Sequence, residues 1–142
     1  MAYEEDRLAE LSKKRVSRIY KDIDMSFEIN PVTKDIGRKY DVNSVKQALK
    51  NLLLTPYFSK PFTPRYGSPI YDMLFEPMDS DTASLIGTLI QEAIDNFEPR
   101  CKVEDVIVYP NYDENEYRVQ INFYVVGVRD PQIFRTSLKR LR

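Results

Sequence analysis

Apolar residues recur at helical spacing through residues 83–97, the longest clearly periodic segment of the chain. Residues 80–82 offer side chains that can cap the start of a helix, and Pro99 disfavours helical backbone at Glu98. The pattern therefore predicts a core helix that ends near Phe97. Its apolar stripe, at positions i, i+3, i+4, i+7, i+8 and i+11, consists of Ile86, Leu89, Ile90, Ala93, Ile94 and Phe97.

A second apolar stripe predicts another helix, capped by Asn43 or Ser44 and ended by Pro56. Ser68 and Pro69 are typical of the start of a short third helix. The loop between them, residues 57–67, is rich in proline and aromatic residues and is expected to pack onto its own domain. In the second helix the buried residues are Val45, Ala48, Leu49, Leu52 and Leu53, and the water-facing ones are Lys46, Gln47 and Lys50.

Beyond Arg100 the apolar period changes to two, which is typical of strands. Residues 103–109 predict one strand, and residues 110–115 form a polar connection to the next, so that the two make a hairpin. The clearest alternation is that of Tyr117, Val119, Ile121, Phe123 and Val125. Near the N-terminus, Met25, Phe27 and Ile29 also alternate with polar residues and predict a half-buried strand before a turn at residues 30–35.

The pattern of residues 132–142 fits two structures. As a strand, the tail would place Phe134, Thr136 and Leu138 on one face. As a helix, it would line up Ile133, Phe134, Ser137, Leu138 and Leu141. The tail contains four basic residues and no acidic one, so it is either a solvated terminus or a docking strand for a partner.

Together these elements predict an α+β fold, a small and mostly antiparallel sheet with two or three helices packed on one face. A chain of 142 residues suits one domain with its own core. We place that domain at residues 20–142. Residues 1–19 form a charged N-terminal helical arm, which is either solvated or ordered by a neighbouring subunit.

Charge and composition exclude several partner classes. The 21 basic and 22 acidic residues leave a net charge of −1, which argues against a nucleic-acid partner. The chain has no apolar run long enough to span a membrane and no signal-peptide pattern, so we expect no membrane partner and no secretion by that route. The single cysteine excludes an internal disulfide.

Most catalytic chemistry is excluded as well. The chain has no histidine, so a Ser-His-Asp or Cys-His set is impossible. It has neither zinc-ligand spacing nor a glycine-rich phosphate loop, and we expect no metal and no cofactor. Arg100 and Lys102 could lower the pKa of Cys101, although a buried structural cysteine is favoured. The surviving enzymatic alternative is a cell-wall glycosidase with Glu76 and Glu98 as its paired carboxylates.

The segment Glu98-Pro99-Arg100 is the most distinctive polar feature. Pro99 restricts the backbone, and the segment is expected to be extended. In an extended segment Glu98 and Arg100 project to the same side. The two charges then either pair with each other as an internal brace or meet charges on a partner.

Six short stretches share their order and spacing with a known family. They are residues 20–24, 30–36, 45–55, 62–67, 74–76 and 93–100. They resemble the baseplate wedge or sheath-initiator family of contractile-tailed bacteriophages, also described as lysozyme-like, with a relative in the type VI secretion baseplate. The resemblance covers residues 20–142 and leaves out residues 1–19.

The resemblance implies a structural, non-enzymatic protein of the virion tail baseplate, assembled in the host cytoplasm, that templates the first ring of tail-sheath subunits. Glu98, Pro99 and Arg100 match the family's Glu-Pro-Arg motif, which implies contact with the helical core bundle of other wedge proteins. The tail tube or hub is a further candidate partner. The family's last strand, which implies an edge that pairs with strands of the sheath protein, is matched by Phe134, Arg135, Thr136, Ser137, Leu138, Lys139 and Arg140.

Overall fold

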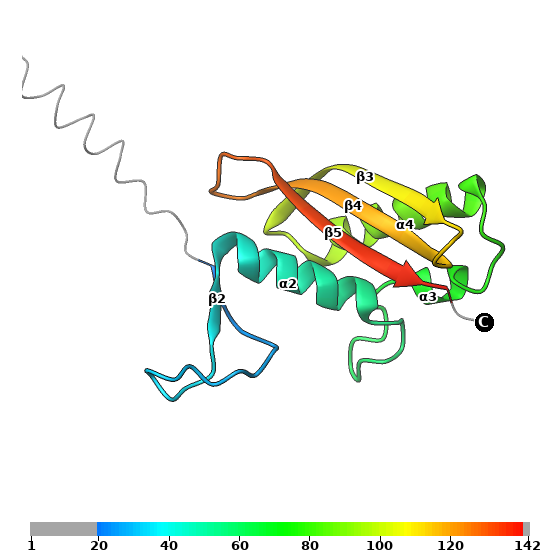
Figure 1. Cartoon of the computed structure of the whole chain (residues 1–142). Helices are drawn as coiled ribbons and strands as arrows, with labels where there is room; N and C mark the ends of the chain where they lie inside the picture. The colour runs from blue at the N-terminus through cyan, green and yellow to red at the C-terminus, as the bar shows by residue number, and fades with distance from the viewer. Residues whose placement is uncertain (1–19, 141–142) are drawn as a thin grey trace, which may run out of the picture.

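The computed structural model describes residues 20–140, and the predicted arm at residues 1–19 lies outside this range. Figure 1 shows a three-stranded sheet flanked by helices, with a two-stranded hairpin that projects away from it. In chain order the elements are β1 (Lys21–Ile23), β2 (Arg38–Tyr40), α2 (Asp41–Leu54), α3 (Ile70–Met73), α4 (Ser80–Phe97), β3 (Cys101–Asn111), β4 (Glu116–Val125) and β5 (Gln132–Lys139).

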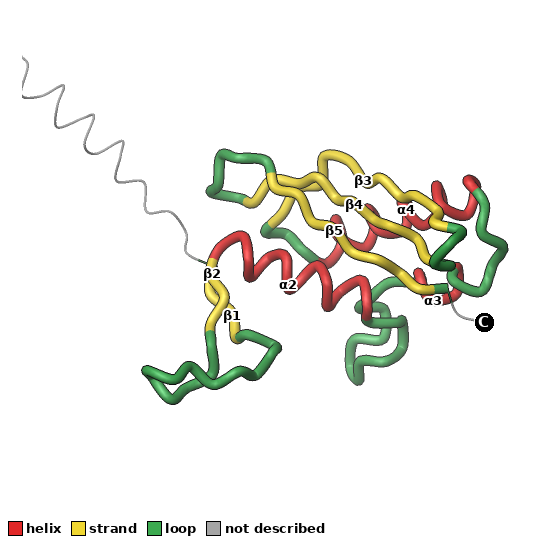
Figure 2. Tube along the Cα trace, viewed as in Figure 1, coloured by secondary structure: helices red, strands yellow, loops and turns green. Residues whose placement is uncertain are grey.

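The main sheet has the order β3-β4-β5, and both of its pairings are antiparallel. β4 lies in the centre (Figure 2), and its predicted alternation is confirmed, because the side chains on its inner face are at most 2% exposed. The outer face carries polar residues such as Arg118, Gln120 and Asn122. One face of the sheet is therefore the core side. β3 and β5 each have one edge that no described strand pairs with.

α4 covers β3, and its predicted stripe is confirmed, with Ile86, Ile90 and Ile94 fully buried. The cap lies one residue earlier than the expected residues. The carboxylate of Asp79 accepts a hydrogen bond of 2.7 Å from the backbone N–H of Thr82. This bond satisfies one of the free N–H groups at the helix start and lowers the pKa of Asp79.

α2 begins at Asp41, and the prediction of a cap at Asn43 or Ser44 was wrong. The Asp41 carboxylate accepts from the backbone N–H of Tyr20 at 3.0 Å, and the N–H of Asp41 donates to the carbonyl of Tyr20 at 2.7 Å. Gln47, expected to face water, is instead buried at 9% exposure. Its amide bonds the backbone of β1, donating to the carbonyl of Ile23 at 2.7 Å. Contacts with residues more than twenty positions away thus determine where this helix begins and which of its side chains are buried.

The half-buried strand predicted around Met25, Phe27 and Ile29 was wrong. These side chains are 53%, 59% and 70% exposed. β1 and β2 form only three residue pairs, and they make a sheet separate from β3-β4-β5. Within residues 20–140 no second layer covers the far end of this hairpin, so its alternating pattern corresponds to no buried face there.

The tail is a strand. β5 pairs with β4 over eight residues, from Gln132 opposite Phe123 to Lys139 opposite Glu116. Leu138 is 4% exposed, and Phe134 packs against the core. The α+β class and the antiparallel sheet are therefore confirmed. None of the helices within residues 20–140 is long and apolar enough to cross a membrane.

Gly67 closes the loop after α2, and we expect Gly67→Ala to lower the free energy of unfolding by about 2 kcal/mol. Its φ is +124°, and an added Cβ would lie 2.3 Å from the carbonyl oxygen of Thr55. That oxygen also accepts from the N–H of Ser68 at 2.9 Å, so it is held in place. Denaturant unfolding measures the change.

Gly127→Ala is the matched control. Gly127 also has a positive φ, +97°, but nothing lies within 4 Å of its added Cβ. We expect a loss of about 1 kcal/mol from backbone strain alone. Equal losses in the two variants would contradict the assignment of the Gly67 effect to the clash with Thr55.

Candidate functional site

The connection from α4 to β3 is a tight turn. The N–H of Glu98 continues the helical pattern by donating to the carbonyl of Ile94 at 2.9 Å. The N–H of Cys101 then donates to the carbonyl of Glu98 at 3.3 Å, and β3 starts at Cys101. The predicted extended conformation of this segment was therefore wrong, because the chain has to reverse here to lay β3 against α4.

Glu98 and Arg100 nevertheless lie on the same side, and they pair with each other. Arg100 Nε donates to Glu98 Oε1 at 2.7 Å, and Arg100 Nη2 donates to Oε2 at 2.8 Å. The Glu98 side chain is 8% exposed and the Arg100 side chain 27%. Of the two alternatives left open by the sequence, the internal pair is present in the free chain.

Arg100 keeps unused hydrogen-bonding capacity in this pair. Two of the five guanidinium N–H donors bond Glu98, so three remain. The hydrogen bonds that Arg100 donates to Glu98 raise the pKa of Arg100, which therefore stays cationic. The guanidinium also lies 5.8 Å from the ring centre of Tyr20. The turn between α4 and β3 thus presents the cation of Arg100 in a fixed orientation, while both carboxylate oxygens of Glu98 accept hydrogen bonds from Arg100.

Cys101 is a buried structural residue, 7% exposed. Burial first, and then the charges of Glu98 and Asp95, raise the pKa of its thiol to about 12. Arg100 lowers this pKa, but by less than burial raises it, so the favoured expectation of a buried structural cysteine is confirmed. A thiol with this pKa is not a nucleophile near neutral pH.

The pairing of β5 with β4 determines which residues of β5 direct their backbone groups to the free edge. The N–H of Arg140 donates to the carbonyl of Asn115 at 3.1 Å, in register with the pairing of Lys139 and Glu116. Because antiparallel pairs alternate, the even-numbered residues of β5 bond β4. The odd-numbered residues direct their backbone N–H and C=O groups outward, and these are Ile133, Arg135, Ser137 and Lys139.

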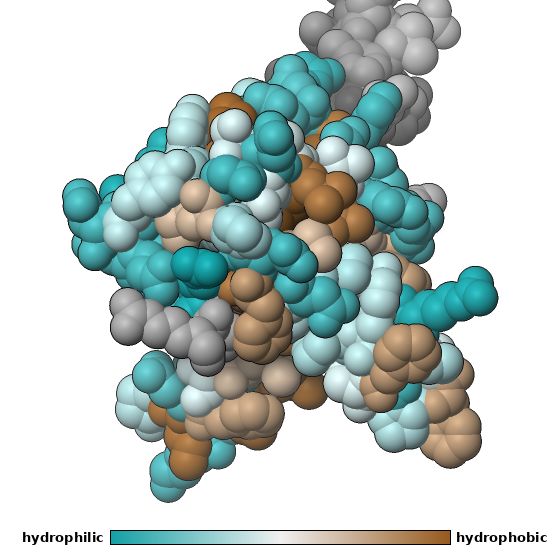
Figure 3. Space-filling view, turned by 90° about the vertical axis from the view of Figure 1, so that its right-hand side faces the viewer, coloured by the Kyte–Doolittle hydropathy of each residue, from teal (hydrophilic) through white to brown (hydrophobic). Residues whose placement is uncertain are grey.

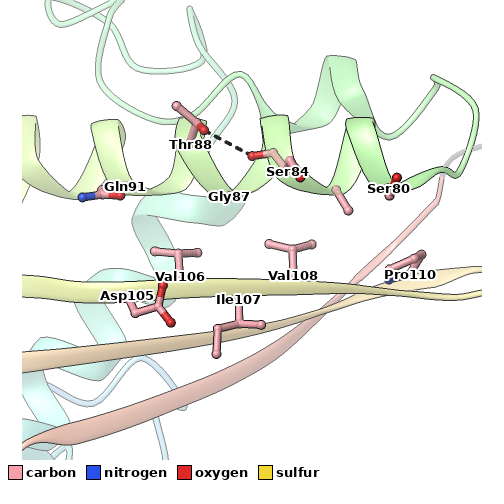
Figure 4. Close-up of a pocket in the computed structure, with 11 residues that line it drawn as sticks. Ser80, Ser84, Gly87, Thr88, Gln91, Asp105, Val106, Ile107, Val108 and Pro110 are labelled. Atoms are coloured by element: carbon pink, nitrogen blue, oxygen red, sulfur yellow. Dashed lines mark hydrogen bonds between the residues drawn. The ribbon is translucent and has the colours of Figure 1, made fainter.

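The opposite edge of the sheet borders a groove of about 410 Å³ between β3 and α4. Figure 4 shows Val106 and Val108 directed toward the helix and Ile107 directed away from it. Small residues of α4, including Ser84 and Gly87, form the helical wall. Asp105 is the one acidic or basic residue of the lining, so this groove holds no pair of groups for acid–base chemistry.

A cluster of exposed aromatic side chains was missed by the sequence reasoning. Tyr57, Phe58 and Phe62 are 39%, 80% and 101% exposed, so the expectation that their loop packs on its own domain was wrong. Within this loop, Tyr66 alone among the aromatics packs, with its ring 5.3 Å from that of Phe97. Apolar side chains reach the surface at several places in Figure 3, including the lobes at its lower end. Because loop residues follow no period, the pattern carried no signal of this exposure.

We expect Phe62→Ala to change the free energy of unfolding by less than about 0.5 kcal/mol, because its side chain contacts solvent. Its φ of +66° lies in the left-handed region, where a non-glycine residue strains the backbone, and such strain is typical of binding surfaces. Tyr66→Ala, at the packed position, is expected to cost about 2 kcal/mol. Equal costs in chemical denaturation would mean that Phe62 packs onto the domain in solution.

The carboxylates of the enzymatic alternative are not arranged for catalysis in the described residues. Glu76 is exposed, and Glu98 is bonded to Arg100. Neither residue lines any of five grooves found on residues 20–140. The same part of the chain has no cluster of three or more His, Cys, Asp or Glu residues that could hold a metal ion.

Sequence comparison relates the chain to one family and one relative. Residues 40–129 match the profile of the family described as baseplate wedge protein gp25. The baseplate wedge protein gp25 of Enterobacteria phage T4 is 34% identical over 115 residues, which are 81% of this chain and 86% of that protein.

Solved structures share the fold. A chain of the anti-feeding prophage baseplate aligns with a TM-score of 0.68 at 26% identity, covering 79% of this chain and 90% of that one. A chain of the type VI secretion system baseplate complex aligns with a TM-score of 0.60 at 18% identity, covering 70% of this chain and 93% of that one. A Geobacter sulfurreducens protein described as a candidate tail lysozyme aligns with a TM-score of 0.58 at 23% identity, covering 68% of this chain and 89% of that one. The last two likenesses show the fold alone.

Proposed function

The chain belongs to the baseplate wedge protein gp25 family, whose members are structural parts of contractile tail baseplates, and we propose that it templates the first ring of tail-sheath subunits. In this proposal the domain docks on the helical core bundle of the other wedge proteins. It then offers the edge of β5 to the tail sheath protein. The tail tube or hub is a further neighbour.

The observation that carries the proposal is the free edge of β5. Four outward-facing residues, from Ile133 to Lys139, offer backbone donors and acceptors to an added strand. Arg135 and Lys139 add positive charge along this edge, which favours an acidic strand as the partner. The strand is anchored by Leu138 in the core, so it is preformed and little ordering is needed on binding.

The second contact of the proposal is made by Arg100. Its three remaining donors suit a carboxylate or the carbonyl groups at a helix end of the core bundle. Glu98 then acts through Arg100, by holding the guanidinium in one orientation, and does not itself meet a partner cation. Pro99 fixes the backbone between the two residues.

We also propose that the chain is not an enzyme. Glu98 cannot serve as a free acid or base while Arg100 bonds both of its oxygens. Glu76 lies on the surface, outside any enclosed site. The paired-carboxylate reaction therefore lacks its two groups.

Baseplates prepared without this chain test the function. Adding the purified chain together with tail sheath protein is expected to yield sheaths that start at the baseplates, and omitting the chain to yield none. Sheaths that start equally often without the chain would refute the templating role. In parallel, incubation with peptidoglycan is expected to give no soluble fragments. Release of fragments that stops in Glu76→Gln or Glu98→Gln would establish the glycosidase instead.

A further inference from the structure

An open groove runs along the outer side of α2, and we call it the α2 groove. Its first part, about 610 Å³, lies between α2 and the β1–β2 hairpin, and its second part, about 480 Å³, lies between α2 and the loop that follows. Met25 and Asn51 line both parts, so the two are continuous. Figure 1 shows the hairpin and the loop projecting from the two ends of α2.

The α2 groove is positively charged. Residues 42–71 contain Lys46, Lys50, Lys60 and Arg65 and no aspartate or glutamate. Lys46 and Lys50 line the first part and Lys60 the second. None of these cations is ion-paired within residues 20–140. The first part also contains Asp24 and Lys39, which pair with each other at 3.2 Å and so leave the excess of positive charge unchanged. The chain as a whole carries a net charge of −1, so the excess of positive charge in this region is not shared by the rest of the chain taken together.

The groove also has apolar walls. Met25 is 53% exposed and Leu54 41% exposed, and both line the second part. Two half-exposed apolar side chains beside three cations suit an occupant that is acidic and carries apolar anchors.

The first eleven residues of this chain have that chemistry. They contain Glu4, Glu5, Asp6 and Glu10 against a single basic side chain, Arg7, and they include the apolar residues Tyr3, Leu8 and Leu11. Residues 12–19 have the opposite charge, with four basic residues and no acidic one. They precede Tyr20, which lies next to the carboxylate of Asp41. The acidic half of the segment is therefore complementary in charge to the α2 groove.

Chain length permits this contact within one molecule. Tyr20 is held at the first residue of α2, where the groove begins. Eight residues, 12–19, span at most about 26 Å when extended. The 14 residues of α2 span about 21 Å. Residues 3–11 can therefore reach any point of the groove, and covalent attachment favours this contact over one between separate chains.

We infer that residues 3–11 of the chain bind the α2 groove of the same molecule, with their acidic side chains against Lys46, Lys50 and Lys60 and their apolar side chains against Met25 and Leu54. This gives the arm a defined binding site on its own domain. The inference concerns the isolated chain and does not depend on the proposed role in sheath assembly.

A spin label on the full-length chain tests the inference. In Ala2→Cys the label attaches at the new residue, because Cys101 is buried and its thiol has a pKa of about 12. We expect loss of the amide NMR signals of residues 43–54, and unchanged signals for Arg118 and Gln120 on the outer face of the sheet. Salt at 1 M is expected to restore the signals, because the Debye length then falls to about 3 Å.

Charge variants and a mixing control complete the test. Lys46→Glu with Lys50→Glu is expected to restore the signals of residues 43–54, and adding Glu4→Lys with Glu5→Lys to lose them again. The same charge change at Lys102 and Lys139 is expected to have no effect. Signal loss limited to the neighbourhood of Tyr20 would overturn the inference. So would signal loss in unlabelled chains mixed with spin-labelled ones, because the contact would then form between molecules.

Discussion

Ser137→Pro is expected to abolish sheath assembly at the baseplate while the domain remains folded. The N–H of Ser137 points to the free edge of β5, so proline removes a donor that an added strand needs. No backbone hydrogen bond to β4 is lost, and edge strands tolerate proline at such positions. The side-chain hydrogen bond from Ser137 to Glu116 is lost in Ser137→Pro and in Ser137→Ala alike. We expect a loss of about 1 kcal/mol in unfolding free energy from backbone adjustment, and sheath initiation reduced at least tenfold. Electron microscopy of baseplates mixed with sheath protein measures the second quantity.

Two variants separate edge pairing from general damage. Ser137→Ala keeps the backbone N–H, and it is expected to initiate sheaths as often as the natural chain. Thr136→Pro removes an N–H that bonds β4, so it is expected to lower the unfolding free energy by about 3 kcal/mol. If Ser137→Pro baseplates carry sheaths at the natural frequency, the sheath does not pair with β5. If Thr136→Pro is the milder variant, the assignment of odd residues to the edge is wrong.

Deletion of residues 132–142 is a poorer test than the proline variant. Leu138 is 4% exposed, and Phe134 packs against the core. Their removal would uncover the inner face of β4 and destabilise the domain by several kcal/mol. Loss of sheath assembly would then have two explanations, whereas Ser137→Pro changes one edge donor.

The elements that could be predicted are those whose burial repeats with a fixed period. Ile86, Ile90 and Ile94 lie on one helical face, and Ile121 and Phe123 lie on one side of a strand, because each element packs against a single continuous core. Periodicity did not decide between helix and strand in the tail. The family resemblance favoured the strand, and the pairing with β4 confirms it.

The elements that could not be predicted depend on contacts between distant residues. Asp41 starts α2 because it bonds Tyr20, and Gln47 is buried because its amide bonds the backbone of Ile23 and Met25. Neither partner is visible in a local window of sequence. The exposure of Phe27 could not be predicted either, because the alternation of apolar and polar residues around it does not reveal whether another layer covers the strand.

The proximity of Glu98 and Arg100 was predicted, whereas the backbone conformation that brings them together was not. Glu98 and Arg100 were expected to project together from an extended segment, and they do meet, but across a turn. A glutamate and an arginine two positions apart can pair in either backbone conformation. Which conformation forms depends on the packing of β3 against α4, which places Cys101 in the core directly after the turn.

Arg100→Met is expected to lower the unfolding free energy by about 3 kcal/mol, because it leaves the carboxylate of Glu98 buried without its partner. The Glu98 side chain is 8% exposed, so water replaces the lost hydrogen bonds poorly. Glu98→Gln is expected to cost less, about 1 kcal/mol, because the 27% exposed side chain of Arg100 keeps access to solvent. Urea unfolding of both variants and of the double variant gives the coupling between the two residues.

The double variant separates stability from docking. Glu98→Gln with Arg100→Met removes both charges, so its unfolding free energy is expected to exceed that of Arg100→Met alone by about 1 kcal/mol or more. Its wedge docking is nevertheless expected to be lost, because the oriented guanidinium is absent. The exposed pair of Arg38 and Asp35, at 52% and 64% exposure, provides the control, and Arg38→Met is expected to change stability by less than about 0.5 kcal/mol. If the double variant joins wedges as well as the natural chain, the pair is only an internal brace. Stability rescued without docking would place the contact with the core bundle on the Glu98–Arg100 pair, since the fold tolerates the loss of the pair and the partner does not.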